Sequence, residues 1–146
     1  MRIKHISDGC IGCMACVVAC KEQHLLPVGV NRCVIEYHEE KRRFIWRGCR
    51  QCKNAPCEKA CDSHAVYTAP DGTVVIDRER CTGCGKCIAA CPFHVMAYDE
   101  RAQQAVKCDT CYIKRTTEHF STNVFDNHET TACVAACPFD RLELVR

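Results

Sequence analysis

The chain has 146 residues, 17 of which are cysteine, and its 20 basic and 18 acidic side chains leave a formal net charge of only +2. This near-balance excludes the strongly basic surface that non-specific binding to nucleic acid or to an anionic membrane requires. Cysteine at 17 of 146 positions, about 12%, also argues against an ordinary hydrocarbon core and indicates a chain organised by disulfides or by metal.

The expected location of the protein decides between these two. The sequence contains no signal peptide and no apolar run of 18 residues, so we expect a cytoplasmic protein without a membrane span. Export in complex with a partner that bears a signal is the alternative. Thiols stay reduced in the cytoplasm, and an odd number of cysteines at short spacings suits a disulfide framework poorly. Metal is therefore the favoured explanation of the cysteines.

Short strands and short helices are predicted to alternate along the chain. In chain order, we predict a strand over 3–6, a helix over 17–24, strands over 30–37, 44–47, 65–68 and 74–77, a helix over 88–90, a strand over 95–98, a helix over 134–136 and a strand over 142–145. The dipeptide Asp71-Gly72 is a hairpin turn signal and predicts a β-hairpin from Val66 to Ile76.

The order strand, cysteine loop, helical turn, strand occurs twice. It predicts a small, loop-rich α+β fold of tandem ferredoxin-like modules, organised around iron–sulfur clusters. We expect residues 1–146 to form a single compact unit. Its outer module would comprise approximately residues 1–40 and 100–146, and its inner module approximately residues 44–99.

Sixteen of the cysteines fall into four motifs of four, and Cys33 is left over. Motif one is Cys10, Cys13, Cys16 and Cys20; motif two is Cys49, Cys52, Cys57 and Cys61; motif three is Cys81, Cys84, Cys87 and Cys91; motif four is Cys108, Cys111, Cys133 and Cys137. Motif three repeats the C-x2-C-x2-C-x3-C spacing of motif one 71 residues further on. Proline follows the last cysteine of motifs three and four.

This spacing is that of bacterial ferredoxins, in which three cysteines hold one [4Fe-4S] cluster and the fourth reaches its neighbour. Sixteen thiolates at four per cluster therefore predict four [4Fe-4S] clusters with crossed ligation. Four tetrahedral zinc sites would use the same number of cysteines. Structural zinc, however, usually pairs C-x2-C knuckles, and a third cysteine two residues further on overloads the loop. Iron–sulfur clusters are thus favoured over zinc, and zinc over disulfides.

The segment Cys49-Arg-Gln-Cys-Lys-Asn-Ala-Pro-Cys-Glu-Lys-Ala-Cys61 resembles the second motif of the four-cluster electron-transfer subunits of the dimethyl sulfoxide reductase type. The resemblance covers nearly the whole chain and includes short soluble relatives. It implies nested ligation by four sets of cysteines, which we name quartets. They are quartet A (Cys10, Cys13, Cys16, Cys137), quartet B (Cys20, Cys108, Cys111, Cys133), quartet C (Cys49, Cys52, Cys57, Cys91) and quartet D (Cys61, Cys81, Cys84, Cys87).

The resemblance also implies a function. It predicts a subunit without catalysis of its own, which relays single electrons between a catalytic molybdenum, tungsten or nickel-iron oxidoreductase and a second redox protein, such as a flavin subunit or a ferredoxin. A tungsten aldehyde oxidoreductase is the preferred partner. A hydrogenase, a formate dehydrogenase or a carbon monoxide dehydrogenase is the alternative, and self-association into an electron-conducting oligomer is a further possibility.

Two absences agree with a relay. The sequence has no G-x-G-x-x-G fingerprint and no phosphate loop, so no second cofactor site of these kinds is predicted. A redox sensor or cluster carrier is the hypothesis of a different class. No helix-turn-helix or basic reading helix is predicted that would give such a sensor its output.

Four features remain open at this point. Asp62 stands where the family has proline and is either an acidic group that lowers a cluster potential or a solvated carboxylate. Cys33 is predicted to be a buried, inert thiol rather than a ligand or redox switch. The insert Tyr112 to Ala132, with His119, Asp126, His128 and Glu129, is either a docking loop or an idle excursion. The basic run Lys41-Arg42-Arg43, with Arg47, Arg50, Lys53 and Trp46, is either a partner-facing patch or a solvated face.

Overall fold

The strands pair as hairpins or, in one case, as the two ends of the chain. The computed structural model describes residues 1–116 and 130–146, and within them eight strands form four antiparallel two-stranded sheets. The pairs are β1 (Arg2–His5) with β8 (Leu142–Val145), β2 (Cys33–His38) with β3 (Arg43–Gly48), β4 (Val66–Thr68) with β5 (Val74–Ile76), and β6 (Ala97–Asp99) with β7 (Gln104–Val106).

The helices are short and begin close to cysteines. They are α1 (Ala15–Gln23), α2 (Pro56–Lys59), α3 (Lys86–Ala90), α4 (Tyr112–Thr116) and α5 (Ala132–Ala135). In the part of the chain that the structure describes, no helix has the length and apolar character needed to cross a membrane. This mixture of short helices and strands joined by loops agrees with the predicted α+β class.

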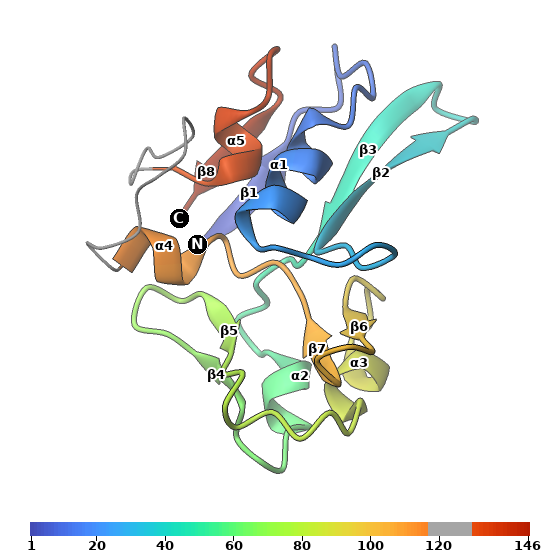
Figure 1. Ribbon diagram of the computed structural model, residues 1–146. Helices are drawn as coiled ribbons and strands as arrows, with labels where there is room; N and C mark the ends of the chain where they lie inside the picture. The colour runs from blue at the N-terminus through green and yellow to red at the C-terminus, as the bar shows by residue number, and fades with distance from the viewer. Residues whose placement is uncertain (117–129) are drawn as a thin grey trace.

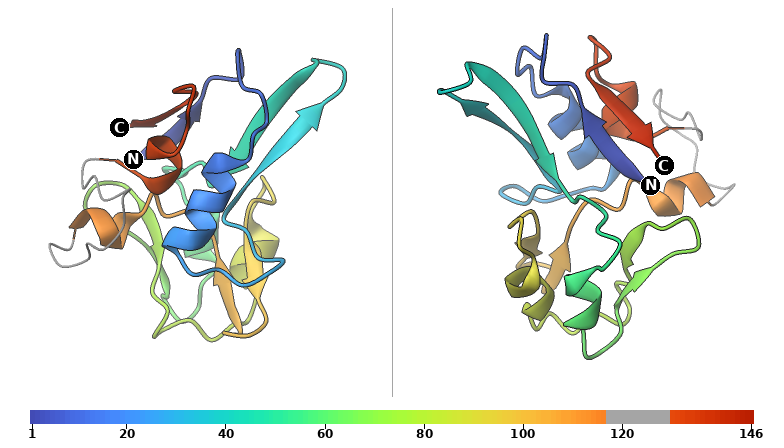
Figure 2. Two further views of the ribbon diagram at one scale, coloured as in Figure 1. Left: turned by 45° about the horizontal axis from the view of Figure 1, so that its top comes forward. Right: turned by 180° about the vertical axis from the view of Figure 1, so that it is seen from behind.

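The elements gather into two groups, which Figure 1 shows one above the other. The upper group holds the paired ends β1 and β8, helices α1 and α5, and the long β2–β3 hairpin. The lower group holds α2, α3 and the short hairpins β4–β5 and β6–β7. Both views in Figure 2 place the two chain termini side by side, as the pairing of β1 with β8 requires.

Each group has its own core, and cysteine supplies much of both. The upper core packs Ile3, Trp46 and Leu142 around thiols of motifs one, two and four. The lower core packs Val66 and Val74 against thiols of motifs two and three. Eleven cysteines are among the buried apolar side chains. The interior therefore depends on sulfur to an extent that aliphatic packing alone does not explain.

The limits of the two predicted modules fall inside hairpins. The interval at residues 40–44 is the turn of the β2–β3 ladder, which belongs whole to the upper group. The limit at residues 99–100 lies within β6–β7, which belongs whole to the lower group. A two-stranded ladder satisfies its backbone groups only when both strands stay together. The division into two modules stays a prediction. Its limits would have to be shifted so that each of these hairpins lies within one module.

Local sequence signals predicted some helices and strands correctly and missed others. The predicted hairpin is confirmed, since Val66 pairs with Ile76 and Gly72 takes a left-handed φ of 81° at the turn. Helix α2, strand β7 and helix α4 were not predicted. Each has only three to five residues, too few to display a hydrophobic period. Strand β2 begins at Cys33, three residues later than the predicted start at residue 30.

Candidate metal centre

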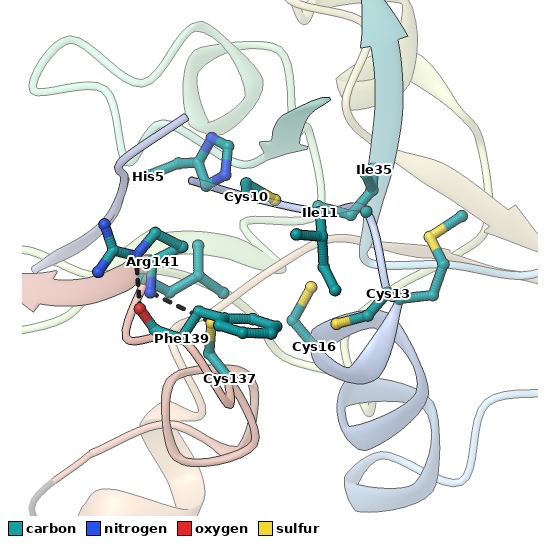
Figure 3. Close-up of a pocket in the computed structure, with 12 residues that line it drawn as sticks. His5, Cys10, Ile11, Cys13, Cys16, Ile35, Cys137, Phe139 and Arg141 are labelled. Atoms are coloured by element: carbon teal, nitrogen blue, oxygen red, sulfur yellow. Dashed lines mark hydrogen bonds between the residues drawn. The ribbon is translucent and has the colours of Figure 1, made fainter. Parts of the chain in front are cut away.

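Quartet A lines one cavity, and Figure 3 shows its four cysteines around a single space. Cys10, Cys13 and Cys16 come from the loop before α1 and from its first turn, whereas Cys137 follows α5. The pairing of β1 with β8 and the packing of α1 on α5 bring these distant segments together. Apolar side chains close the cavity, among them Ile11 and Phe139.

Quartet C lines a second cavity. Cys49, Cys52 and Cys57 come from motif two, and Cys91 comes from the end of motif three. This cavity also has a cationic lining, which quartet A does not share to the same degree, because Arg50 and Lys107 both border it. In both cavities the sulfurs surround a space. Across residues 1–116 and 130–146, no three His, Cys, Asp or Glu side chains converge tightly enough to hold a single metal ion.

The members of quartet B are all buried and lie within electrostatic reach of one another. Cys133 interacts with Cys111 and Cys20, and Cys108 interacts with Cys133 and Cys20. Burial raises the pKa of Cys111 to about 11 and that of Cys133 to about 12. These thiols would hold their protons at neutral pH unless a cation displaced them. Metal binding at this quartet would therefore release protons.

Quartet D is more open to solvent. The structure brings Cys87 into electrostatic contact with Cys61 and Cys81, and burial raises the pKa of Cys87 to about 11. Cys84 lies in the same loop with an exposed side chain. Burial also raises the pKa of Cys61, but hydrogen bonds from Ser63 and the backbone N–H of Val66 outweigh it, so the net pKa is lowered. Cys61 is thus poised toward the thiolate that a metal needs.

Cysteines of neighbouring quartets lie within electrostatic reach of one another or pack in the same core. Cys16 of quartet A interacts with Cys133 of quartet B. Cys49 of quartet C packs in the same core as Cys108 of quartet B. Cys57 of quartet C interacts with Cys87 of quartet D. Quartets A and B are thus neighbours, as are quartets C and D, and the upper core, which also contains Cys16, joins Cys49 of quartet C to quartets A and B.

Backbone N–H groups donate to several of the sulfurs. Arg141 N donates to Cys137 Sγ at 3.2 Å, and Thr110 N donates to Cys108 Sγ at 3.4 Å. Val66 N donates to Cys61 Sγ at 3.4 Å. Such donors stabilise thiolate ligands and help to set cluster potentials. Four thiols around each of two cavities, with N–H donors aimed at sulfur, are a donor set that fits an iron–sulfur cluster.

Glycine in the repeated motif serves close packing. Gly12 and Gly83 occupy equivalent places in motifs one and three, and both have a positive φ. A Cβ at Gly12 would collide with the Phe44 ring, and one at Gly83 would collide with the Gln103 carbonyl oxygen. In each of the two groups of elements the cysteine loop thus packs closely against a hairpin, β2–β3 at Gly12 and β6–β7 at Gly83. Only glycine allows this approach at a left-handed φ.

Quartet B has charged neighbours that the sequence analysis missed. Arg32 Nη1 lies 2.9 Å from Asp109 Oδ1, and both side chains are nearly buried. Burial raises the pKa of Asp109, but the neighbouring positive groups, Arg32 first among them, together outweigh burial, so the pKa is lowered overall. His24 Nε2 lies 3.5 Å from Cys111 Sγ, and burial lowers the pKa of this imidazole to about 4. Asp109 could have been noticed within Cys-Asp-Thr-Cys, whereas nothing local marks Arg32 or His24.

Cys33 is buried, as predicted, and it touches quartet B. It packs in the same core as Cys20, and this neighbouring thiol, together with burial, raises the pKa of Cys20. Asp62, beside quartet D, has an exposed carboxylate that pairs with Lys86 Nζ. The hydrogen bond from Lys86 lowers the pKa of Asp62. The acidic charge predicted at this position is therefore countered locally by a cation.

The basic run is divided by the fold. Lys41, Trp46, Arg47 and Arg50 line a surface groove of about 830 Å³, together with Phe93, over whose ring the Arg50 guanidinium lies at 4.5 Å. The remaining members, Arg42, Arg43 and Lys53, do not line it. Arg47 forms an ion pair with Glu36 at 2.9 Å.

The predicted docking loop can be followed only at its two ends. Tyr112 belongs to α4 and Ala132 to α5. His119, Asp126, His128 and Glu129 lie outside the described residues. The docking role of this insert stays a prediction.

Comparison with protein families finds two matches that together cover most of the chain. Residues 40–145 match a 4Fe-4S dicluster domain, and residues 7–23 match a 4Fe-4S binding domain. The first match alone spans motifs two, three and four, and the second contains motif one.

Two curated relatives align over nearly the full length of this chain, and a third aligns over about two thirds of it. The thiosulfate reductase electron transfer subunit PhsB of Salmonella typhi is 35% identical over 150 residues, covering 97% of this chain and 73% of the relative. Protein NrfC of Escherichia coli is 37% identical over 142 residues, covering 92% of this chain but only 60% of the relative. The formate dehydrogenase iron-sulfur subunit of Wolinella succinogenes is 45% identical over 98 residues, covering 63% of this chain and 49% of the relative.

Proposed function

This chain belongs to the 4Fe-4S dicluster-domain family of iron–sulfur electron-transfer subunits, and on that premise we propose that it relays single electrons through four [4Fe-4S] clusters to or from a catalytic oxidoreductase subunit. Clusters of this kind supply one-electron redox chemistry when bound. The contribution of the polypeptide is to hold them, screen them from water and keep them close together.

Quartets A to D are the ligand sets of this proposal. The observation that carries it is the convergence of cysteines from distant motifs on common cavities, Cys137 with motif one and Cys91 with motif two. This crossed pattern is the one that ferredoxin spacing predicts. The neighbour relations between quartets support a path A–B–C–D along which electrons would pass.

Electrons would enter and leave where the path approaches the surface. Cys13 of quartet A and Cys84 of quartet D are the two exposed cysteines of the chain, and they belong to the two ends of the path. The apolar rim at quartet A includes Ile11 at 56% exposure and Met14 and Phe139 at 44% each. Such an uncovered apolar rim around a redox site suits a protein partner.

The partner would be a molybdenum or tungsten oxidoreductase, by family resemblance. A tungsten aldehyde oxidoreductase is the narrower proposal, and a hydrogenase, a formate dehydrogenase or a carbon monoxide dehydrogenase is the alternative. The similarity to PhsB and to the formate dehydrogenase subunit supports the broad class. Self-association into a wire remains a further proposal, and an unchanged particle size between dilute and concentrated samples in sedimentation would exclude it.

The test begins with anaerobic purification of the full chain, followed by quantification of iron, sulfide and zinc. About sixteen irons per chain, at four per cluster, are expected. Electron paramagnetic resonance during stepwise reduction with dithionite would then give spin-coupled signals from neighbouring clusters. Iron near zero with about four zincs per chain would overturn the proposal and indicate a structural protein.

A further inference from the structure

Lys107 is a buried lysine at the junction of the two groups of elements. It directly precedes Cys108 of quartet B, and its side chain is only 3% exposed. Nζ donates to the carbonyl oxygens of Val74, in the lower core, and of Cys108, in the upper core at 3.1 Å. The same side chain lines the quartet C cavity, where its charge acts on Cys57.

Among the described residues, this ammonium has no anionic side chain as a direct partner. Over residues 1–116 and 130–146, no carboxylate lies within ion-pair distance of Lys107 Nζ. The charge of Lys107 helps to lower the pKa of Asp109, but the Asp109 carboxylate is paired with Arg32 at 2.9 Å. A buried charge without a counter-charge is strongly unfavourable, so an anion is expected nearby. Carbonyl oxygens occupy two of the three N–H donors of the ammonium and leave one for it.

A purely structural explanation for Lys107 is weakened by Gln51. The Gln51 amide is buried and connects the same two residues, because Nε2 donates to Cys108 O at 2.8 Å and Oε1 accepts from Val74 N at 2.8 Å. A neutral side chain thus already ties the upper core to the lower core. The positive charge of Lys107 is not needed for that connection, and the space it faces is bounded by four thiols.

We propose that Lys107 is the counter-ion of the cluster in quartet C and raises its reduction potential above the value that the ligands alone would give. The inference rests on the ligand assignment proposed above. Four thiolates around a 2+ core carry a charge of about −2, and one-electron reduction makes it about −3. A fixed cation beside the cavity is attracted more strongly to the reduced form. Reduction adds one electron to the core, with no bond formed or broken.

The test compares three variants of the full chain and adds a fourth, described below, to identify the affected couple. Lys107→Met removes the charge and keeps much of the side-chain length, whereas Lys107→Arg keeps the charge. Lys21→Met is the matched control, because Lys21 Nζ also donates to two backbone carbonyls, those of Pro27 and Val30, yet lines neither cysteine cavity. Each protein is assayed for iron and sulfide and then titrated with dithionite under electron paramagnetic resonance.

We expect Lys107→Met to keep about sixteen irons and to lower one midpoint potential by at least about 59 mV. This shift corresponds to about a tenfold decrease in the equilibrium constant for one-electron reduction. Cys52→Ser identifies the couple, since that variant should lose the same one. Lys107→Arg and Lys21→Met should leave all the potentials in place. Selective loss of one cluster in Lys107→Met but not in Lys107→Arg would also support the counter-ion role.

Two results would overturn this role without touching the relay proposal. One is a set of unchanged potentials in an iron-replete Lys107→Met protein. The other is an equal loss of iron in Lys107→Met and Lys107→Arg, which would assign Lys107 to packing. Absence of [4Fe-4S] clusters from the unmodified chain would instead refute the proposed function itself.

Discussion

Quartets B and D each consist of four cysteines, but one quartet is buried and the other is partly open to solvent. All members of quartet B are buried, and Arg32, Asp109, His24 and Cys33 enclose them. Quartet D leaves Cys84 exposed and Cys81 half-buried, and the ion pair Asp62 with Lys86 beside it is solvated. Charges at quartet B act through a poorly polarisable interior, whereas those at quartet D are screened by water.

The difference teaches that the surroundings, rather than the ligands, distinguish these sites. A buried ion pair is costly to break because one charge is then left without a partner. An exposed pair contributes little because water replaces either member. Substitutions at quartet B should therefore have large effects, and equivalent substitutions at quartet D should have small ones.

The largest effect is expected from loss of a buried ligand. Cys108→Ser should lose the cluster of quartet B, about four of sixteen irons, because serine is a poor ligand in a site that water cannot enter. Iron and sulfide analysis after anaerobic purification measures the loss. Cys33→Ser is the matched control, since Cys33 is equally buried beside the same quartet and is predicted not to be a ligand. A comparable iron loss in Cys33→Ser would contradict the assignment.

The second effect concerns the buried ion pair. Arg32→Met leaves the Asp109 carboxylate buried without its cation and should destabilise the protein by about 3–5 kcal/mol. Thermal loss of the iron–sulfur absorbance would report the difference. The double variant Arg32→Met/Asp109→Asn should recover much of the stability. If the double variant is no more stable than the single one, then the cost is one of packing and not of charge.

An intermediate case is a half-buried ion pair between the β4–β5 turn and helix α4. Asp71, in the β4–β5 turn, contacts Arg115 of α4 at 3.1 Å. Partial burial raises the pKa of Asp71, but hydrogen bonds from Thr73 and Arg115 lower it below 3.8 overall. Its contribution is therefore complete above that pH and is lost as the pH falls through the folded pKa. Asp71→Asn should cost about 0.5–1 kcal/mol, equally at pH 5, 6, 7 and 8. A cost that changes across this range in thermal unfolding would refute the interpretation.

The smallest effect is expected at the exposed pair. Asp62→Asn leaves the Lys86 ammonium uncompensated and should raise the midpoint potential of the quartet D cluster only slightly, because both side chains are exposed and water screens their charges. Lys86→Met leaves the Asp62 carboxylate uncompensated and should lower that potential slightly. The equilibrium constant for one-electron reduction should fall by less than about tenfold. Potentiometric titration at low and high salt is the measurement. A large shift that persists at high salt would mean that quartet D is as shielded as quartet B.

Ligand spacing was the part of the site that could be predicted from sequence. The separations of three and four residues within motifs one and three are local, so the cysteine loops follow from the sequence itself. The Val66–Ile76 hairpin was predictable for the same reason, because Asp71-Gly72 encodes its turn. Helix α2, strand β7 and helix α4 were not predicted, because each is too short to show a periodic hydrophobic pattern.

By itself, then, the sequence determined the kind of cofactor and the family of electron carriers, and it predicted which cysteines hold the clusters, since each depends on residues close together in the chain. Only the tertiary structure decided which segments meet. The pairing of β1 with β8 brings Cys137 to Cys10, and the fold places Arg32 on Asp109 and Gln51 on Cys108. These partners are separated by tens of residues, and Lys107 faces quartet C only because the two cores meet there. Long-range contacts of this kind leave no spacing pattern, so the electrostatic surroundings of each quartet became visible only in three dimensions.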